Sequence, residues 1–366
     1  MRILWLAHRD PQGPRAGGAE KTILEIARRL VTRGHSINLV TASWAGAPPR
    51  SELLGLSIRR FPWVMGPHLA LPSLLRREKD GSRPDVIVED LAHAVPWFSG
   101  YLTDIPTVAF FRHLHARTLP GQVSPPVAAV LTWVEKQYPR IFSRASFVAP
   151  SPSARNDLVR LGVNPRRIAI IGYGVDDSFY LRGSKAPRPT MIYFAGMRRY
   201  KRPEHAILAL EKLVAQGLDI RLTMVGTGPM VEDLKNVVQR LGLQNRVDFT
   251  GRLSVESLAG RVSEAWVHVQ TSVAEGWGLT VEEATCCGTP TVAYDVAGIV
   301  DSVTNGTNGV LVPNGDVNAL SLAVERVIAN KDAWQKRCLS TPSRTSWDKV
   351  ADEWEALLIR LTTSDS

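Results

Sequence analysis

The segment Glu275-Gly-Trp-Gly-Leu-Thr-Val-Glu-Glu283 combines a pair of glycines with several carboxylates, and its residue types are suited to binding a phosphorylated sugar. The two glycines permit a tight loop with bare backbone amides. A helix is expected to begin near Leu279 and to end at Gly288-Thr-Pro290. Its first amides, near Leu279 and Thr280, would then point at an anion with the favourable end of the helix dipole. The segment therefore predicts a diphosphate site.

The carboxylates of this segment require a different ligand. Glu283 lies about one turn inside the expected helix, where a carboxylate repels phosphate but can accept two hydrogen bonds from ribose or sugar hydroxyls. Glu275, in the loop, could bind a second sugar in the same way. Helix-dipole complementation alone would account for Glu282 and Glu283, but it does not account for Glu275 or for the glycines.

Three further glycine-containing loops follow strand-like segments. Gly196-Met-Arg-Arg-Tyr-Lys-Arg202 carries four cations and favours a phosphate site over a solvated basic turn. Val225-Gly-Thr-Gly-Pro229 could shape a ligand cleft or simply turn the chain. Ala16-Gly-Gly-Ala-Glu-Lys21 lets the backbone approach an anion at a helix start, or forms only a tight turn. It is not GxGxxG, which disfavours an NAD dehydrogenase.

The elements that position these loops alternate between strand-like apolar runs and segments of helical period, as in a parallel α/β sheet. The alternation of strands and helices begins again at residue 191, after a stretch over 181–190 that is rich in proline, glycine and charge and is typical of a linker. The predicted domains are residues 1–185, with the tail 345–366 packed back on them, and residues 186–344. The expected strands are 3–7, 37–41, 85–88, 107–111, 146–150, 191–196, 221–226, 247–251, 266–271 and 291–294. The first expected helix has Ile23, Ile26, Ala27, Leu30 and Val31 on one face and ends at Gly34, and the others cover 203–216, 229–241, 254–263, 279–287, 317–330 and 347–361.

Composition narrows the class of protein. The chain has 366 residues, enough for two such domains, and three cysteines, an odd number that favours a reducing cytosol. The sequence contains no apolar stretch of the ~20 residues that a membrane helix needs. Residues 1–185 hold 25 Lys and Arg against 14 Asp and Glu, whereas residues 186–366 hold 19 against 21. The basic excess could serve an anionic membrane surface, a lipid phosphate acceptor, an acidic polymer or solubility alone.

At these residues the chain resembles the retaining family-4 glycosyltransferases of GT-B fold. The E-x7-E pattern of that family is met by Glu275 and Glu283. Other matching patterns are Gly17-Gly18, Gly34-His35, Gly174-Val-Asp176, Gly196 with Arg198 and Lys201, Thr250-Gly-Arg252, Ala284-Thr-Cys-Cys-Gly-Thr-Pro290, Gly298 and Asn308-Gly309. The resemblance spans nearly the whole chain and is more specific in its second half. It implies two facing Rossmann-like domains, with a cleft between them and a C-terminal helix that crosses back to the first domain.

The resemblance also implies roles for individual residues. Lys201 and Arg198 would hold the donor diphosphate, together with backbone amides near Gly278 and Leu279. Glu283 would bind the nucleotide ribose, and Glu275 would bind the transferred sugar. The remaining donor-side residues carried over are Gly17, Gly18, Gly226, Arg252 and Thr280. The family needs no metal and no cofactor beyond its substrate, which is here expected to be a UDP- or GDP-sugar.

Two departures from the family pattern matter. The spacing from Gly196 to Lys201 is one residue shorter than the commoner form, so Arg199 could take the role given to Arg198. The family also often places a histidine at the end of a first-domain strand, facing the donor sugar. Here Arg112 occupies that slot, which leaves His113 as the predicted catalytic residue beside Glu275, with His115 behind it. Either histidine could instead serve packing.

The activity implied is sugar transfer, with retained anomeric configuration, to an acceptor glycan or lipid-linked glycan. The basic first half favours an acceptor at an anionic membrane, so we expect a cytoplasmic protein bound peripherally at the inner face, with no nucleic-acid partner. Two alternatives stay open from sequence. One is an epimerase or phosphorylase acting on sugar nucleotides; the other is a non-catalytic sugar-nucleotide-binding subunit, which the Arg112 departure would suit.

Overall fold

The computed structural model describes residues 1–14, 16–75, 83–180, 183–341 and 345–363. The chain forms two compact units. The first comprises residues 1–116, 125–174 and 345–366, and the second comprises residues 117–124 and 175–344. The division after Gly174 lies upstream of the boundary placed at residue 185, and Leu181 and Arg182 of the expected linker lie outside the described residues.

The first unit is built on a sheet to which the described residues contribute eight strands, in the order β3-β4-β2-β1-β5-β6-β7-β8. All neighbouring strands are parallel except β3 and β4. The bounds are β1 Arg2–Leu6, β2 Ser36–Ala42, β3 Arg50–Leu53, β4 Leu56–Phe61, β5 Val86–Leu91, β6 Thr107–Phe111, β7 Ser146–Ala149 and β8 Ile168–Ile170. From β1, the sheet is extended on one side by β2, β4 and β3 and on the other side by β5, β6, β7 and β8. The topological switch point of this sheet therefore lies between β1 and β5.

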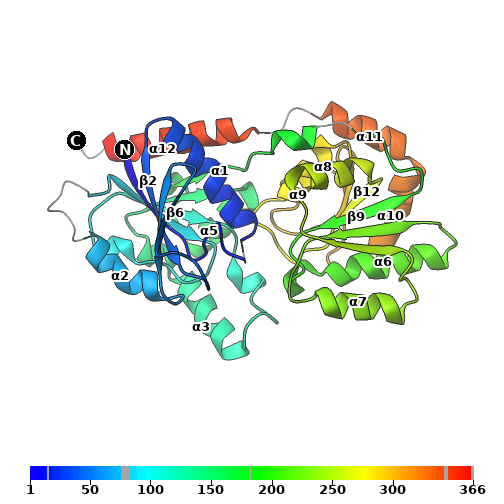
Figure 1. Cartoon of the computed structure of the whole chain (residues 1–366), viewed down its shortest axis with the longest axis horizontal. Helices are drawn as coiled ribbons and strands as arrows, with labels where there is room; N and C mark the ends of the chain where they lie inside the picture. The colour runs from blue at the N-terminus through cyan, green and yellow to red at the C-terminus, as the bar shows by residue number, and fades with distance from the viewer. Residues whose placement is uncertain (15, 76–82, 181–182, 342–344, 364–366) are drawn as a thin grey trace. The chain divides into compact units, whose positions relative to one another are not determined.

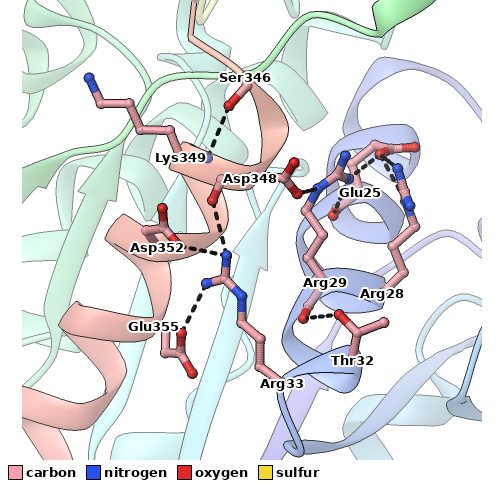
Figure 2. Close-up of polar contacts among 10 residues, drawn as sticks. All are labelled: Glu25, Arg28, Arg29, Thr32, Arg33, Ser346, Asp348, Lys349, Asp352 and Glu355. Carbon is pink, nitrogen blue, oxygen red and sulfur yellow. Dashed lines mark hydrogen bonds and ion pairs between the residues drawn. The ribbon is translucent and has the colours of Figure 1, made fainter.

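The tail helix α12 (Trp347–Thr363) packs on helix α1 (Gly18–Thr32) and on the sheet of the first unit (Figure 1). Its apolar stripe is buried, and the Trp354 ring lies 5.4 Å from the Trp5 ring and 4.8 Å from the Phe110 ring. Ion pairs line the solvent side of the same contact, where Arg33 meets Asp352 and Glu355 (Figure 2). The chain thus returns to its first unit at its C-terminal end.

The second unit holds a fully parallel sheet, to which the described residues contribute six strands in the order β11-β10-β9-β12-β13-β14. The strand bounds are β9 Thr190–Phe194, β10 Arg221–Val225, β11 Val247–Gly251, β12 Val267–Gln270, β13 Thr291–Tyr294 and β14 Gly309–Val312. The helices are α6 Pro203–Ala215, α7 Val231–Arg240, α8 Val255–Glu264, α9 Leu279–Cys286, α10 Val317–Ala329 and α11 Lys331–Ser340. This order reverses between β9 and β12. Both sheets therefore have the Rossmann-like arrangement that the sequence predicts.

Several elements of the first unit were missed by the sequence analysis. Strands β3 and β4 form a hairpin whose turn places Leu54 at φ 52 and Gly55 at φ 78, and its strands are too short to give a clear apolar alternation. Helix α2 contains Pro72, which obscures a helical pattern. The bounds of the remaining elements are α2 Gly66–Leu75, α3 Pro125–Lys136, α4 Tyr138–Ile141, α5 Pro152–Leu161, and the short helices η2 Ser99–Tyr101, η3 His115–Arg117, η4 Pro165–Arg167, η5 Asp177–Tyr180 and η6 Arg199–Lys201.

Candidate functional site

The loops that leave β9 and β12 meet at the switch point of the second sheet, where ligands of open α/β sheets usually bind. Backbone and side-chain hydrogen bonds hold the two loops together. The Val273 amide donates to the Tyr200 carbonyl at 2.8 Å, and the Thr271 hydroxyl lies 2.9 Å from the Lys201 carbonyl and 2.8 Å from that of Arg202. The two sequence segments predicted to bind the donor are therefore neighbours in space.

Lys201 and Glu275 form an ion pair at this point. Their side chains are 16% and 12% exposed, so water screens the pair only partly. The Ser272 hydroxyl donates to Glu275 Oε1 at 2.7 Å, and the Gln270 amide donates to the same oxygen at 3.2 Å. Burial lowers the pKa of Lys201, but the Glu275 carboxylate outweighs that effect and the net pKa is raised. The ammonium group is thus held charged at the site predicted for a diphosphate.

Ser272 and Gln270 are two further residues of this site, and they are not predicted from the sequence. Both fix the orientation of Glu275 through its Oε1 atom. The available signal was the polar run Gln270-Thr-Ser272 at the end of a buried strand, because polar residues at the carboxyl end of a parallel strand face the loops of its neighbours.

Helix α9 begins at Leu279, where the sequence predicts it, and Gly278 is its N-cap residue. A Cβ atom at Gly278 would collide with the Ser302 hydroxyl, so a side chain there would require Ser302 to move. Gly298, at φ 82, lies equally close to the carbonyl of Glu275 and fixes the preceding loop. Among the described residues, the Thr280 hydroxyl and the Trp277 indole nitrogen are buried without a hydrogen-bond partner. The start of α9 therefore offers polar groups to a ligand.

Most of the other donor-side residues lie after strands β9, β10 and β11 of the same sheet. Arg198 caps the short helix η6 and is half-buried, whereas Arg199 and Arg252 are exposed. Gly226 follows β10 at φ 133 and donates its amide to the Gly251 carbonyl at 2.8 Å, which brings the ends of β10 and β11 together. Glu283 is buried within α9, at 5% exposure.

In the first unit, Gly17 and Gly18 begin helix α1. The Glu20 carboxylate accepts a hydrogen bond from the Gly17 amide at 2.7 Å, which is the glutamate half of a capping box. The glycine pair thus starts a helix as expected, and one of its amides is already occupied by a side chain of the same helix.

Arg112 at the end of β6 is buried in an ion pair. Its guanidinium meets both oxygens of Asp90 at 2.9 and 3.1 Å, donates to the Tyr173 hydroxyl at 2.9 Å and stacks on Phe110. Burial lowers the pKa of Arg112, but Asp90 and Tyr173 outweigh it and the net pKa is raised. These contacts show how the chain accommodates arginine where the family pattern often has histidine: the carboxylate at the end of β5 compensates the buried charge.

The two candidate histidines differ in their surroundings. His115 is buried, and its backbone amide donates to Glu135 at 2.7 Å while its Nδ1 lies 3.3 Å from the same carboxylate. His113 is half-buried, with its ring 4.9 Å from that of His115. The role of His113 as the group facing the donor sugar stays a prediction.

Two family models match the chain. Residues 16–179 match the model described as Glycosyltransferase Family 4, and residues 181–348 match Glycosyl transferases group 1. A D-inositol 3-phosphate glycosyltransferase from Nocardiopsis dassonvillei is 27% identical over 92% of this chain and 88% of its own. Sucrose-phosphate synthase from Thermosynechococcus elongatus superposes with a TM-score of 0.82 at 22% identity, over 99% of each chain. HepE from Anabaena in complex with UDP-glucose superposes with a TM-score of 0.76 at 17% identity, over 98% of this chain and 99% of that one.

The fold and the matched models define the chain as a nucleotide-sugar-dependent glycosyltransferase of GT-B fold. Within that class, the two adjoining matches support a glycosyltransferase of the family-4 type. Among the described residues no group of histidine, cysteine and carboxylate side chains is arranged to hold a metal ion, and none of the described helices is both long and apolar enough to cross a membrane.

Proposed function

We propose that the protein transfers a sugar from a UDP- or GDP-sugar to an acceptor hydroxyl with retention of anomeric configuration. The observation that carries this proposal is the ion pair between Lys201 and Glu275 at the switch point of the second sheet. The pair combines a charged ammonium with an oriented carboxylate in the loops that precede α9. A diphosphate is bound by cations and amides, whereas sugar hydroxyls are bound by a carboxylate that accepts their hydrogen bonds. The complex of the structural neighbour HepE with UDP-glucose supports a UDP-linked donor.

In this proposal the diphosphate lies against Lys201, Arg198 and the first amides of α9, near Gly278, Leu279 and Thr280. These groups stabilise the charge that develops on the leaving diphosphate. Arg199, Gly226 and Arg252 follow strands β9, β10 and β11 of the same sheet. In this proposal they contact the phosphates or the base. Glu283 accepts hydrogen bonds from the ribose. In this proposal, these residues bind the donor and stabilise the leaving diphosphate without a metal ion or a cofactor.

Glu275 serves as a hydrogen-bond acceptor for the transferred sugar and not as a covalent nucleophile. Its carboxylate is paired with Lys201 and accepts from Ser272 and Gln270, so its charge is largely compensated. A compensated carboxylate is a weak nucleophile but a well-oriented partner for sugar hydroxyls. In the first unit, we propose His113 for contact with the transferred sugar and the glycine pair Gly17-Gly18 for the phosphates.

We assign the acceptor to the first unit and expect a glycan or lipid-linked glycan at the inner face of a membrane. The basic excess of residues 1–185 favours an anionic surface. Large apolar side chains also protrude at the start of α2, where Trp63 is 80% exposed and Leu69 is 76% exposed, with Val64 and Met65 between them also exposed. Exposed tryptophan is typical of peripheral membrane contacts.

The proposal is tested by a thermal-shift screen with UDP-, GDP- and ADP-sugars, because a ligand that binds the folded protein raises its apparent stability. The sugar nucleotide that gives the largest shift is then incubated with candidate acceptors, and the anomeric configuration of the product is read by proton NMR. Retained configuration supports the proposal. Inverted configuration, or conversion of the donor alone to an epimer, contradicts it.

A further inference from the structure

Two histidines meet at the switch point of the first sheet. His8 follows β1 and His93 follows β5, and these two parallel strands are the neighbours between which the order of the sheet reverses. Their ring centroids are 4.9 Å apart, in an edge-on arrangement. The same position in the second sheet is where Lys201 and Glu275 meet, and it is where open α/β sheets place their ligands.

Two more rings complete this cluster, which we call the His8 cluster and which consists of His8, His68, His93 and Trp97. The Trp97 ring lies 4.7 Å from that of His8 and stacks on His68 at 4.1 Å with an interplanar angle of 7°. His68 comes from α2 and Trp97 from the loop after β5. His68 and His93 are half-buried, so the cluster reaches the surface of the unit, whereas His8 and Trp97 lie beneath them.

The buried members of the cluster carry polar atoms without a hydrogen-bond partner among the described residues. These atoms are Nδ1 and Nε2 of His8 and Nε1 of Trp97. The His8 side chain belongs to a residue that is only 6% exposed, and Trp97 is 2% exposed. A buried polar group that lacks a partner destabilises the folded state. Three such atoms lie together at a position where open α/β sheets bind ligands, and a bound molecule could supply their partners.

We infer that the His8 cluster binds a neutral hydroxyl-bearing group, and that this group belongs to the acceptor molecule. The argument is one of chemical complementarity. A neutral imidazole presents one N–H donor and one acceptor nitrogen, and the indole adds a second donor. A hydroxyl group both donates and accepts, so a sugar or polyol satisfies all three atoms. The inference rests on the proposed transfer reaction for the identity of the molecule, but the binding itself does not depend on it.

The charges around His8 favour a neutral ligand over an anion. Burial, together with the nearby His93, His68, His115 and Arg9, holds the pKa of His8 well below its usual range. The imidazole is therefore uncharged near neutral pH and offers no formal charge to a phosphate. Within the described part of the chain, these side chains also form no grouping that could hold a metal ion.

The test uses the full chain labelled with nitrogen-15 in its eight histidines. Methyl α-D-glucopyranoside and myo-inositol are titrated in while the imidazole nitrogens are followed by NMR, and inorganic phosphate is titrated separately. No nucleotide sugar is present, so failure of the proposed transferase activity leaves this experiment intact. We expect a saturable shift of the His8 and His93 signals with a neutral polyol and none with phosphate. A shift with phosphate alone, or no saturable shift with either polyol, overturns the inference.

A matched set of variants identifies the residue responsible. His8→Leu removes both ring nitrogens without leaving a void and is expected to weaken polyol affinity at least tenfold, followed through the His93 signals. His8→Gln keeps one donor and one acceptor. Its polyol affinity is therefore expected to stay within about threefold of that of the wild type. His205→Gln, in the second unit, is the control. If His8 only fills space, His8→Leu leaves polyol affinity unchanged and the inference fails.

His8→Leu is expected to fold, because it replaces a buried polar group that lacks partners with an apolar one. Its melting temperature checks this. Should it not fold, His93→Ala at the half-buried edge of the cluster provides the second test, and an unchanged polyol affinity in that variant also overturns the inference.

Discussion

Lys201 and Glu275 form an ion pair although 74 residues separate them in the sequence. One follows β9 and the other follows β12, and these strands are neighbours where the order of the sheet reverses. Each group compensates the charge of the other. In the function that we propose, a nucleotide sugar presents its diphosphate to the lysine and its hydroxyls to the carboxylate. In that proposal, the contact between Lys201 and Glu275 is exchanged for contacts of each residue with the donor.

Replacing Lys201 with alanine is expected to weaken binding of both UDP and inorganic diphosphate. A hydrogen bond to a charged group contributes roughly 1.5–3 kcal/mol, which corresponds to a loss of about tenfold to a hundredfold in affinity. Isothermal titration calorimetry with each ligand measures this. Lys235→Ala is the control, because Lys235 forms an exposed pair with Glu232 on α7. Equal affinities of the Lys201 and Lys235 variants would contradict the assignment.

Replacing Glu283 with alanine is expected to separate ribose recognition from phosphate recognition. UDP affinity should fall at least about tenfold, since a bidentate contact to the ribose hydroxyls is lost, whereas the affinity for inorganic diphosphate should hold. The same calorimetry distinguishes this pattern from that of the Lys201 variant. Glu256→Ala, at an exposed position on α8, serves as the control. If the Glu283 variant binds UDP as the wild type does, the ribose role is wrong.

The second unit is expected to lose stability as the pH falls below the ordinary pKa of histidine. Burial lowers the pKa of His268 from 6.5 to about 3 in the folded state. The unfolded chain therefore binds a proton between these values and the folded chain does not, so stability is full above pH 6.5 and declines as pH falls towards 3. Near pH 4.5 the contribution from this group is a loss of about 3 kcal/mol.

Urea unfolding near neutral pH and near pH 4.5 measures this loss. His268→Asn cannot titrate and keeps a polar atom near the Thr291 hydroxyl, which lies 3.0 Å from His268 Nδ1. Its free energy of unfolding should depend less steeply on pH than that of the wild type. Equal slopes for the two proteins would show that His268 is not the group responsible.

The contact between α12 and the first unit is expected to depend on its buried face and much less on its ion pairs. Trp354 is fully buried against Trp5 and Phe110, so Trp354→Ala should cost about 3–5 kcal/mol of stability. Arg33→Ala should cost at most about 1 kcal/mol, because Asp352 at the other end of its pair is 67% exposed (Figure 2). Calorimetric unfolding measures both. A larger loss for the Arg33 variant would reverse this ranking.

The exposed residues at the start of α2 are expected to contribute to membrane binding. The wild type should sediment with vesicles of phosphatidylglycerol and phosphatidylcholine, and added salt should weaken that binding. Changing Trp63 and Leu69 to serine should weaken it by about tenfold or more, because burial of either side chain contributes roughly 1.5–3 kcal/mol. Ile359→Ser on α12 is the control, since Ile359 is also exposed. Vesicle binding that is insensitive to both salt and these changes would exclude this face.

Much of the fold could be read from the sequence. Apolar period and glycine or proline stops predict α1, α6, α9, α10 and α12 because burial of one helical face imposes that spacing on the chain itself. The alternation of these helices with buried strands predicts two parallel sheets for the same reason. The donor segments were also visible, since glycine, cation and carboxylate at strand ends are local features. Helix α2 is not predicted because Pro72 interrupts its apolar period, and the β3–β4 hairpin is not predicted because its strands are too short to show one.

By itself, then, the sequence determined which segments form strands and helices and which loops carry charged or glycine residues, because these properties depend on neighbours along the chain. Only the tertiary structure decided which loops meet. Strand order brought Lys201 to Glu275, Asp90 to Arg112 and His8 to His93. Pairing of strands is set by the packing of whole layers, and no local spacing records it. Arg112, which from the sequence could be a replacement for a catalytic histidine, is in the fold a buried cation held by a carboxylate on the neighbouring strand.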